Sequence, residues 1–130
     1  MNSEPTITIY VNCSEPIEVK GHKQTIVMVP FTGTAEGSGF TGKVVGTGYD
    51  TQKILPDGTW LLSARYILEG TDSTGAYCKI FIENESCEDG IIRPRITTDS
   101  SELAFLEDER MHSEIEPVEG GVVIKIVLDK

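Results

Sequence analysis

The sequence predicts an all-β fold, a single-domain antiparallel β-barrel of about eight to ten strands. Apolar and polar residues alternate over short segments, and almost nowhere do they follow the helical spacing. Gly, Pro, Asn and Asp separate these segments at the intervals typical of sandwiches and barrels. The 13 glycines suit strongly coiled strands, which favours a barrel over a sandwich. At 130 residues the chain has the length of one domain, which we place at 1–130.

The N-terminal part of the chain supplies the clearest alternation. Residues 6–11 place Ile7, Ile9 and Val11 opposite polar neighbours, as a half-buried strand does. Pro30 interrupts a strongly apolar segment and cannot donate to a ladder, so we expect a bulge or an edge position there. The strands expected in this part are residues 6–11, 16–20, 25–36 and 40–45, with a hairpin turn at 37–39.

The C-terminal part begins with a polar segment at 48–52, which we interpret as a turn flanked by Gly48. After an Asp-Gly turn comes the longest uninterrupted strand candidate, and the chain ends in a hairpin across Gly120 and Gly121. The expected strands are 60–69, 76–83, 110–118 and 122–128; residues 91–99 look irregular, and 101–107 has some helical character.

The net charge argues against several classes of partner, and the cysteine content and the N-terminal residues indicate the cellular location. The chain carries 21 acidic and 11 basic residues, a net charge of −10. Phosphate contacts and anionic membrane surfaces need clustered Lys and Arg, so we expect no nucleic acid and no membrane among its partners. The N-terminal residues lack the basic and apolar regions of a signal peptide, and the odd number of cysteines, three, fits reduced thiols. We therefore expect a cytoplasmic protein.

The strand at 60–69 has two mixed faces. A period of two places Trp60, Leu62, Ala64, Tyr66 and Leu68 on one face, and Leu61, Ser63, Arg65, Ile67 and Glu69 on the other. Either the first set lines the barrel and Arg65 lies in water, or Arg65 points inward toward an anionic ligand. Arg65 and Tyr66 are adjacent, so they point to opposite faces unless a bulge intervenes. The sequence leaves both alternatives open.

Two further residues are candidates for chemistry. Asp50 either caps its own turn or acts as a general acid or base at a barrel mouth, which would require a raised pKa. Tyr66 either packs in the core or donates a hydrogen bond to a ligand oxygen. His112, Glu114 and Glu116 have the chemical types of metal ligands, but their spacing matches a solvated strand face, so we expect no metal and no other cofactor.

Several of these segments together resemble a known family. Residues 40–45, the Gly48-Tyr49-Asp50-Thr51-Gln52 segment, Asp57-Gly58, Ala64-Arg65-Tyr66 and Ile82-Glu83-Asn84 are similar to the bacterial family catalogued as domain of unknown function 3237. The resemblance implies a one-domain antiparallel β-barrel, and the family has no general activity assigned to it. It is specific from about residue 42 to residue 84. Beyond Asn84 the chain departs from the family pattern, with Glu85-Ser86-Cys87 and Ala104-Phe105-Leu106.

These observations lead to a functional prediction. We expect a β-barrel that binds a small organic molecule, with cofactor-free isomerase, cyclase or lyase chemistry on an oxygenated metabolite if it is an enzyme, which the sequence leaves open. The competing interpretation is a non-catalytic structural or interaction protein that forms a homo-oligomer through barrel surfaces. We assign Asp50 and Tyr66 to catalysis, and Arg65, Glu69, Trp60 and Glu83 to ligand binding.

Overall fold

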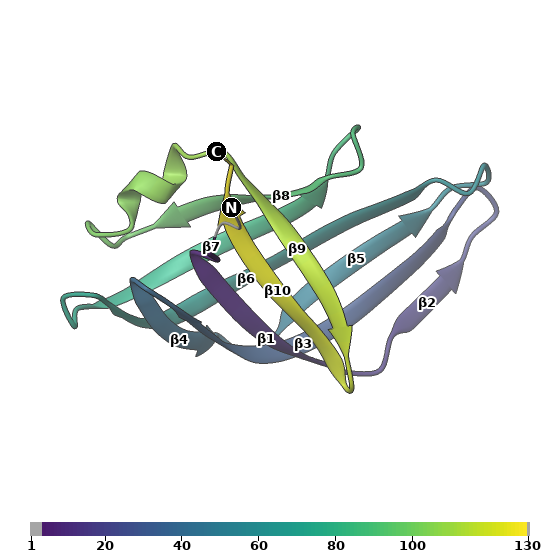
Figure 1. Cartoon of the computed structure of the whole chain (residues 1–130). Coiled ribbons are helices and arrows are strands. Elements are labelled where there is room, and N and C mark those ends of the chain that lie inside the picture. The colour runs from purple at the N-terminus through teal and green to yellow at the C-terminus, as the bar shows by residue number, and fades with distance from the viewer. Residues whose placement is uncertain (1–3, 130) are drawn as a thin grey trace.

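The computed structural model describes residues 4–129 and consists almost entirely of β-strands (Figure 1). A single short 3-10 helix, η1 (Ala104–Glu107), lies within that range. The strands are β1 (Ile7–Cys13), β2 (Ile17–Lys20), β3 (Thr25–Gly37), β4 (Phe40–Val44), β5 (Gly48–Ile54), β6 (Trp60–Asp72), β7 (Tyr77–Ser86), β8 (Ile92–Thr98), β9 (Met111–Val118) and β10 (Gly121–Leu128). Between residues 4 and 129 no helix is long and apolar enough to span a membrane.

All ten strands belong to one antiparallel sheet, in which eight follow the order β8-β7-β6-β4-β3-β1-β10-β9 and β2 and β5 lie off this path. The two longest strands, β3 and β6, have 13 residues each and organise the rest. β3 pairs with β1 and β2 along one edge and with β4 and β5 along the other, and β6 pairs with β4, β5 and β7. The sheet curls into a closed barrel, and β2, β3, β5 and β6 extend beyond the β9–β10 hairpin (Figure 1). The predicted fold class is confirmed.

The core follows from the alternation of side chains along the paired strands. Ile9, Leu68, Ile80, Ile82 and Ile126 are completely buried, and each lies at an inward position of its strand. Burying side chains of this size stabilises the fold by about 1.5–3 kcal/mol each. Every second residue of β6 from Trp60 to Leu68 faces inward, and Ala64, Tyr66 and Leu68 are buried.

Two expectations about secondary structure are wrong. The polar segment at 48–52 is not a turn; it is strand β5, which is held between β3 and β6. Gly48 fits there because an added Cβ would meet the ring of Phe31 and the Cβ of Tyr66. Residues 91–99 are not irregular either, since β8 pairs with β7 throughout. Pro94 is accommodated because β8 is an end strand of the sheet, where one edge needs no ladder partner.

Pro30 neither bends nor breaks β3. The register continues from Val29 opposite Asp50, through Pro30 opposite Tyr49, to Phe31 opposite Gly48. On its other edge β3 changes partner at this point, from β2 before Pro30 to β1 after it. The missing N–H therefore falls where the ladder is interrupted in any case.

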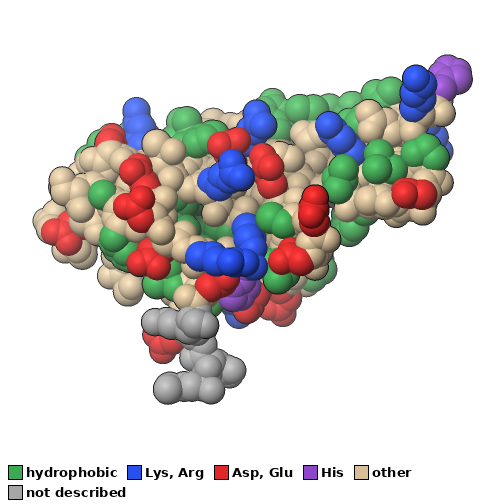
Figure 2. All heavy atoms as spheres, turned by 90° about the horizontal axis from the view of Figure 1, so that it is seen from above, with side chains coloured by type: hydrophobic (Ala, Val, Ile, Leu, Met, Phe, Trp, Pro, Cys, Tyr) green, Lys and Arg blue, Asp and Glu red, His purple; other side chains and the backbone are tan. Residues whose placement is uncertain are grey.

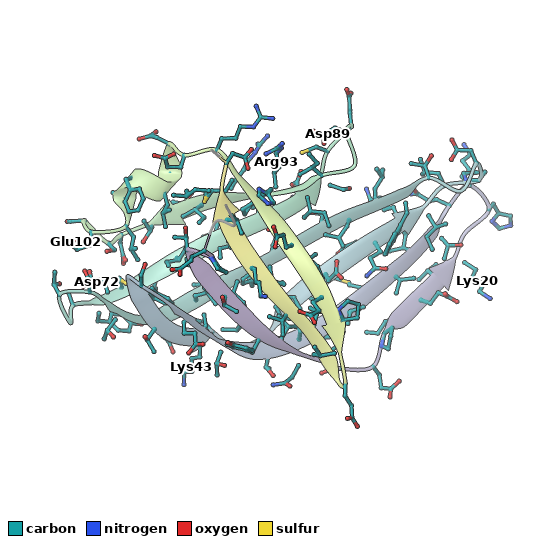
Figure 3. The ribbon with its side chains drawn as sticks, viewed as in Figure 1. Lys20, Lys43, Asp72, Asp89, Arg93 and Glu102 are labelled. Carbon is teal, nitrogen blue, oxygen red and sulfur yellow. The ribbon has the colours of Figure 1, made fainter. Side chains whose placement is uncertain are left out.

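Charged side chains bridge the seam where β8 and β9 meet. Arg93 of β8 donates to the carbonyl oxygen of Met111 at 3.1 Å and forms a 2.8 Å ion pair with Asp129. Asp89, at the turn before β8, lies beside Arg93 (Figure 3) at 3.7 Å. His112 places Nδ1 2.7 Å from the Asp129 carboxylate and Nε2 3.2 Å from Glu114. The Arg93 bonds join β8 to β9 and to the residue after β10, and among residues 4–129 no backbone ladder joins β8 to β9 or β10. His112 holds the same Asp129 carboxylate from β9.

We expect Gly70→Ala to destabilise the protein by about 1–3 kcal/mol. Gly70 lies opposite Gly42 in the β4–β6 ladder, and an added Cβ would meet the Thr41 carbonyl oxygen and the Gly42 Cα. Urea denaturation measures the free energy of unfolding. Thr71→Ala, at the exposed neighbouring position, is the matched control and should stay within about 0.5 kcal/mol of wild type. Equal effects of the two substitutions would contradict the proposed close approach of the strands.

The contacts of His112 with Asp129 and Glu114 should make stability depend on pH. Hydrogen bonds to Asp129 and Glu114 raise the pKa of His112 above its ordinary 6.5. The stabilisation of the folded state by protonated His112 is therefore fully present below pH 6.5, and it is lost as the pH rises through the folded-state pKa. The difference in melting temperature between wild type and His112→Gln should shrink from pH 5.5 to pH 8.5, and the energy involved is at most about 1 kcal/mol because surface pairs are screened. A difference that stays constant over that range would argue against a charged His112.

Candidate functional site

The interior of the barrel contains an apolar cavity of about 250 Å³. Strands β1, β3, β5, β6, β7, β9 and β10 all contribute to its wall. The lining residues are Val11, Cys13, Val29, Phe31, Asp50, Gln52, Trp60, Leu62, Ala64, Asn84, Ile115, Pro117, Val122 and Ile124. Trp60 is 60% exposed and stands at the mouth, and the aliphatic residues form most of the wall. Such a pocket, apolar with few polar groups, is typical of sites for small organic molecules.

Two polar residues of the cavity, Asp50 and Asn84, lie in one row across three neighbouring strands, and Gln52 lies opposite Leu62 in another row. Asp50 of β5 lies opposite Ala64 of β6, and Ala64 lies opposite Asn84 of β7. Directly paired residues of an antiparallel sheet point to the same face, so all three side chains face the lumen. Ala64 is small, which leaves the space between the carboxylate and the carboxamide open.

Asp50 has the properties of an acid or base in an apolar site. Its Oδ2 accepts a hydrogen bond from Gln52 Nε2 at 2.8 Å. Its Oδ1 is buried and has no hydrogen-bond partner among residues 4–129. Burial raises the pKa of Asp50, and the bond from Gln52 lowers it by a smaller amount. A carboxyl group with a raised pKa and a free oxygen in a cavity is suited to taking up and returning a proton.

Asn84 was not assigned to the site by sequence reasoning. It is 1% exposed, its Oδ1 accepts from Ser113 Oγ at 2.8 Å, and its Nδ2 has no partner in the described part of the chain. The sequence contained a signal for it. In an extended strand Asn84 points to the same face as Ile80 and Ile82, so a polar amide occupies an inward position on an apolar strand face. A buried polar residue on such a face needs a partner.

Tyr66 lies in the core beside the cavity, and it is not one of the lining residues. Its ring makes an edge-to-face contact with Phe31, with centroids 5.3 Å apart. Burial raises the pKa of Tyr66, and its hydroxyl has no hydrogen-bond partner among the residues that the structure describes. The contact with Phe31 connects Tyr66 to the cavity wall.

Arg65, Glu69 and Glu83 lie on the opposite face of the sheet. Arg65 Nε is 3.4 Å from Glu83 Oε2, and the Arg65 side chain is 64% exposed. Glu69 accepts a 2.7 Å hydrogen bond from the Tyr77 hydroxyl at the surface. The alternation of β6 therefore separates Arg65 from Asp50 and Trp60. These three residues are candidates only for a ligand on the outer surface, whereas Asp50 and Trp60 are together in the cavity.

Comparisons with known proteins agree with this architecture. The family model described as "Protein of unknown function (DUF3237)" matches residues 1–85. A UPF0311 protein of Clostridium acetobutylicum is 35% identical over 89 residues, which is 65% of this chain and 52% of the relative. The chain thus matches about half the length of that curated relative.

Solved structures share the fold at low sequence identity. A protein with unknown function from Clostridium acetobutylicum ATCC 824 has a TM-score of 0.78 at 22% identity, with 100% of both chains covered. A protein described as β-barrel-like from Acinetobacter baumannii AYE has a TM-score of 0.75 at 16% identity, covering 99% of this chain and 96% of the other. A structure described as an enzyme from Penicillium herquei has a TM-score of 0.74 at 17% identity, covering 98% and 94%.

The match of the family model extends over more than half of the chain and includes β5 and β6, which carry Asp50, Trp60 and Ala64. The chain belongs to the family of proteins of unknown function known as DUF3237.

Proposed function

We propose that this protein binds a small organic molecule inside the barrel and that Asp50 exchanges a proton with it. The observation that carries the proposal is the unpartnered Oδ1 of Asp50 in the apolar cavity of about 250 Å³. An unsatisfied buried acceptor costs about 1–3 kcal/mol, so its retention in a folded protein calls for an explanation. A hydroxyl or acidic C–H group of a ligand would supply the missing partner.

The chemistry that fits this site needs no cofactor. In an isomerisation or cyclisation the ionised Asp50 would remove a proton from one atom of the bound molecule and return it to another, so that no second reactant is consumed. The raised pKa of Asp50 brings the carboxyl closer to the working pH, which favours both transfers. The enzyme from Penicillium herquei among the structural neighbours supports the idea that this fold can carry catalysis. The roles assigned to Tyr66 and Arg65 remain predictions.

Asp50→Asn should weaken ligand binding about tenfold or more, because a hydrogen bond to a charged group is worth about 1.5–3 kcal/mol. Thermal-shift screening of uncharged and anionic oxygenated metabolites identifies ligands, and titration calorimetry compares their affinities. Thr51→Ala is the matched control, since Thr51 is the next residue on β5 and lines the outer surface. Asp50→Asn should itself melt no lower than wild type at pH 7, because it removes a buried charge.

Two results would contradict this assignment. If no compound in a broad library stabilises the protein, the cavity is not a ligand site under these conditions and the function fails. If ligand stabilisation survives Asp50→Asn and disappears in Arg65→Ala, the site lies on the outer surface beside Glu83, 3.4 Å from Arg65.

A second function, association with another copy of the chain, is favoured by the free edge of β2. Among residues 4–129 this strand pairs only with β3, and all four of its residues are exposed. Hydrophobic side chains cover part of the extension (Figure 2). Ile17 and Val19 of β2 are 60% and 61% exposed. An exposed apolar edge strand is a ready site for pairing with a second strand.

The charges of β2 match an antiparallel pairing of two copies. A two-fold axis at Val19 places Glu18 of one copy opposite Lys20 of the other, and opposite charges across a ladder stabilise it. The two-fold rotation produces the Glu18–Lys20 contact twice, so the strand is complementary to itself.

Light scattering after size exclusion tests this association. We expect wild type to have twice the 14.2 kDa mass of the chain, and Glu18→Lys to run as a monomer because Lys would face Lys20 across the axis. The double variant Glu18→Lys, Lys20→Glu restores the opposite charges and should restore the dimer. A monomeric wild type, or a dimer indifferent to Glu18→Lys, would exclude this interface.

A further inference from the structure

We propose that Asn84 is a ligand-binding residue and that the cavity takes an uncharged ligand with two polar ends. One end is a carbonyl or similar oxygen that accepts a hydrogen bond from Asn84 Nδ2, and the other is a hydroxyl that faces Asp50 Oδ1. The inference rests on the proposed function, because it requires a ligand in the barrel. It adds the chemical class of that ligand and a residue that recognises it.

Asn84 lines the cavity and carries a buried donor without a partner among the described residues. Ser113 Oγ of β9 donates to its Oδ1 at 2.8 Å, which leaves Nδ2 as the unpaired end of the amide. The side chain is 1% exposed, so water outside the barrel does not satisfy Nδ2, and no described residue accepts from it. Since a buried amide nitrogen without a partner is rare, an acceptor on a ligand is the simplest way to complete its hydrogen bonding.

The register of the sheet sets the distance between the two ends of the ligand. Neighbouring strands lie about 4.8 Å apart, so the backbones of β5 and β7 are separated by roughly 10 Å. Asp50 and Asn84 stand on these strands with Ala64 between them. A flat molecule can therefore lie over the Ala64 methyl group and reach one polar group with each end.

The charges around the cavity favour an uncharged molecule. None of its lining residues is Lys, Arg or His, and Asp50 is the only carboxylic acid among them. A carboxylate or phosphate would lie beside Asp50 without a counter-ion, and transferring a charge into an apolar site is costly without a partner. An ammonium group would pair with Asp50 but would leave the Asn84 donor without an acceptor, because ammonium only donates.

Para-substituted phenols of similar size that differ in their second polar end test the ligand class. Para-hydroxyacetophenone, para-hydroxybenzoate and tyramine each present a phenol at one end and, respectively, an uncharged carbonyl, a carboxylate and an ammonium at the other. The same three end groups on a hydroxynaphthalene scaffold extend the set to a larger molecule. Titration calorimetry of the full-length protein at pH 7 gives the affinities. We expect the uncharged ketones to bind at least about tenfold more tightly than the charged members.

Asn84→Leu tests the residue, since Leu keeps the volume and removes the donor. The affinity for the ketone should fall about fivefold to tenfold, the effect of one lost hydrogen bond. Ile80→Val, a conservative change on the same face of β7 but outside the cavity lining, is the packing control. If Asn84→Leu does not fold, the side-chain amide signal of Asn84 in wild type gives the same answer by NMR, because a new acceptor at Nδ2 shifts it on addition of the ketone.

The outcomes separate this inference from the proposed function. Ketone binding that is sensitive to Asn84→Leu, or that shifts the Asn84 amide signal, supports it. Tighter binding of the carboxylate or the amine, or ketone binding that leaves Asn84 unaffected, overturns the ligand class while the binding function survives. Failure of every member of the set to bind, together with failure of the broad screen, overturns both.

Discussion

The register that joins β5, β6 and β7 is the constraint on which the site depends. It brings Asp50, Ala64 and Asn84 into one row and turns all three toward the lumen. The same register sends Arg65 and Glu83 to the outer face, where they pair with each other. A shift of β6 by one residue would exchange these two sets, and the cavity would then hold a cation and lose its small central residue. The chemistry of the interior is therefore a consequence of strand pairing.

One end of the barrel interior is well packed, whereas the other contains buried polar atoms without hydrogen-bond partners among the described residues. Around Leu68, Ile80 and Ile82 the inward residues are apolar and fully buried. Around Asp50 and Asn84 two polar atoms are buried without partners, and burial raises the pKa of the Asp50 carboxyl. Unsatisfied polar groups in a low-dielectric interior destabilise a fold, and they persist where the surrounding structure is stable enough to hold them. The packed end of the barrel supplies that stability.

Closure of the barrel and the geometry of the cavity are connected through β9. The seam beside β8 is bridged by Arg93, which reaches Met111 and Asp129, and His112 of β9 holds the same Asp129 carboxylate. On the inner side of the same strand, Ser113 holds the Asn84 amide. Adjacent residues of β9 thus serve two purposes, with His112 holding the carboxylate that pairs with Arg93 and Ser113 orienting a cavity residue. Opening of the seam would release both contacts.

The sequence alone determined the all-β class, most of the strands and the membership suggested by the segment from residue 42 to residue 84, because alternation and turn residues are local signals. It also identified Asp50 and Trp60, which the structure places in the cavity. It misread β5 as a turn and β8 as irregular, since polar or proline-containing strands become strands through their neighbours' ladders. Which face of the strand beginning at Trp60 points into the barrel was decided only by the tertiary structure. A strand with two mixed faces has no preferred side of its own, and the pairing of β6 with β5 and β7 in a closed barrel turns Ala64 inward and Arg65 outward.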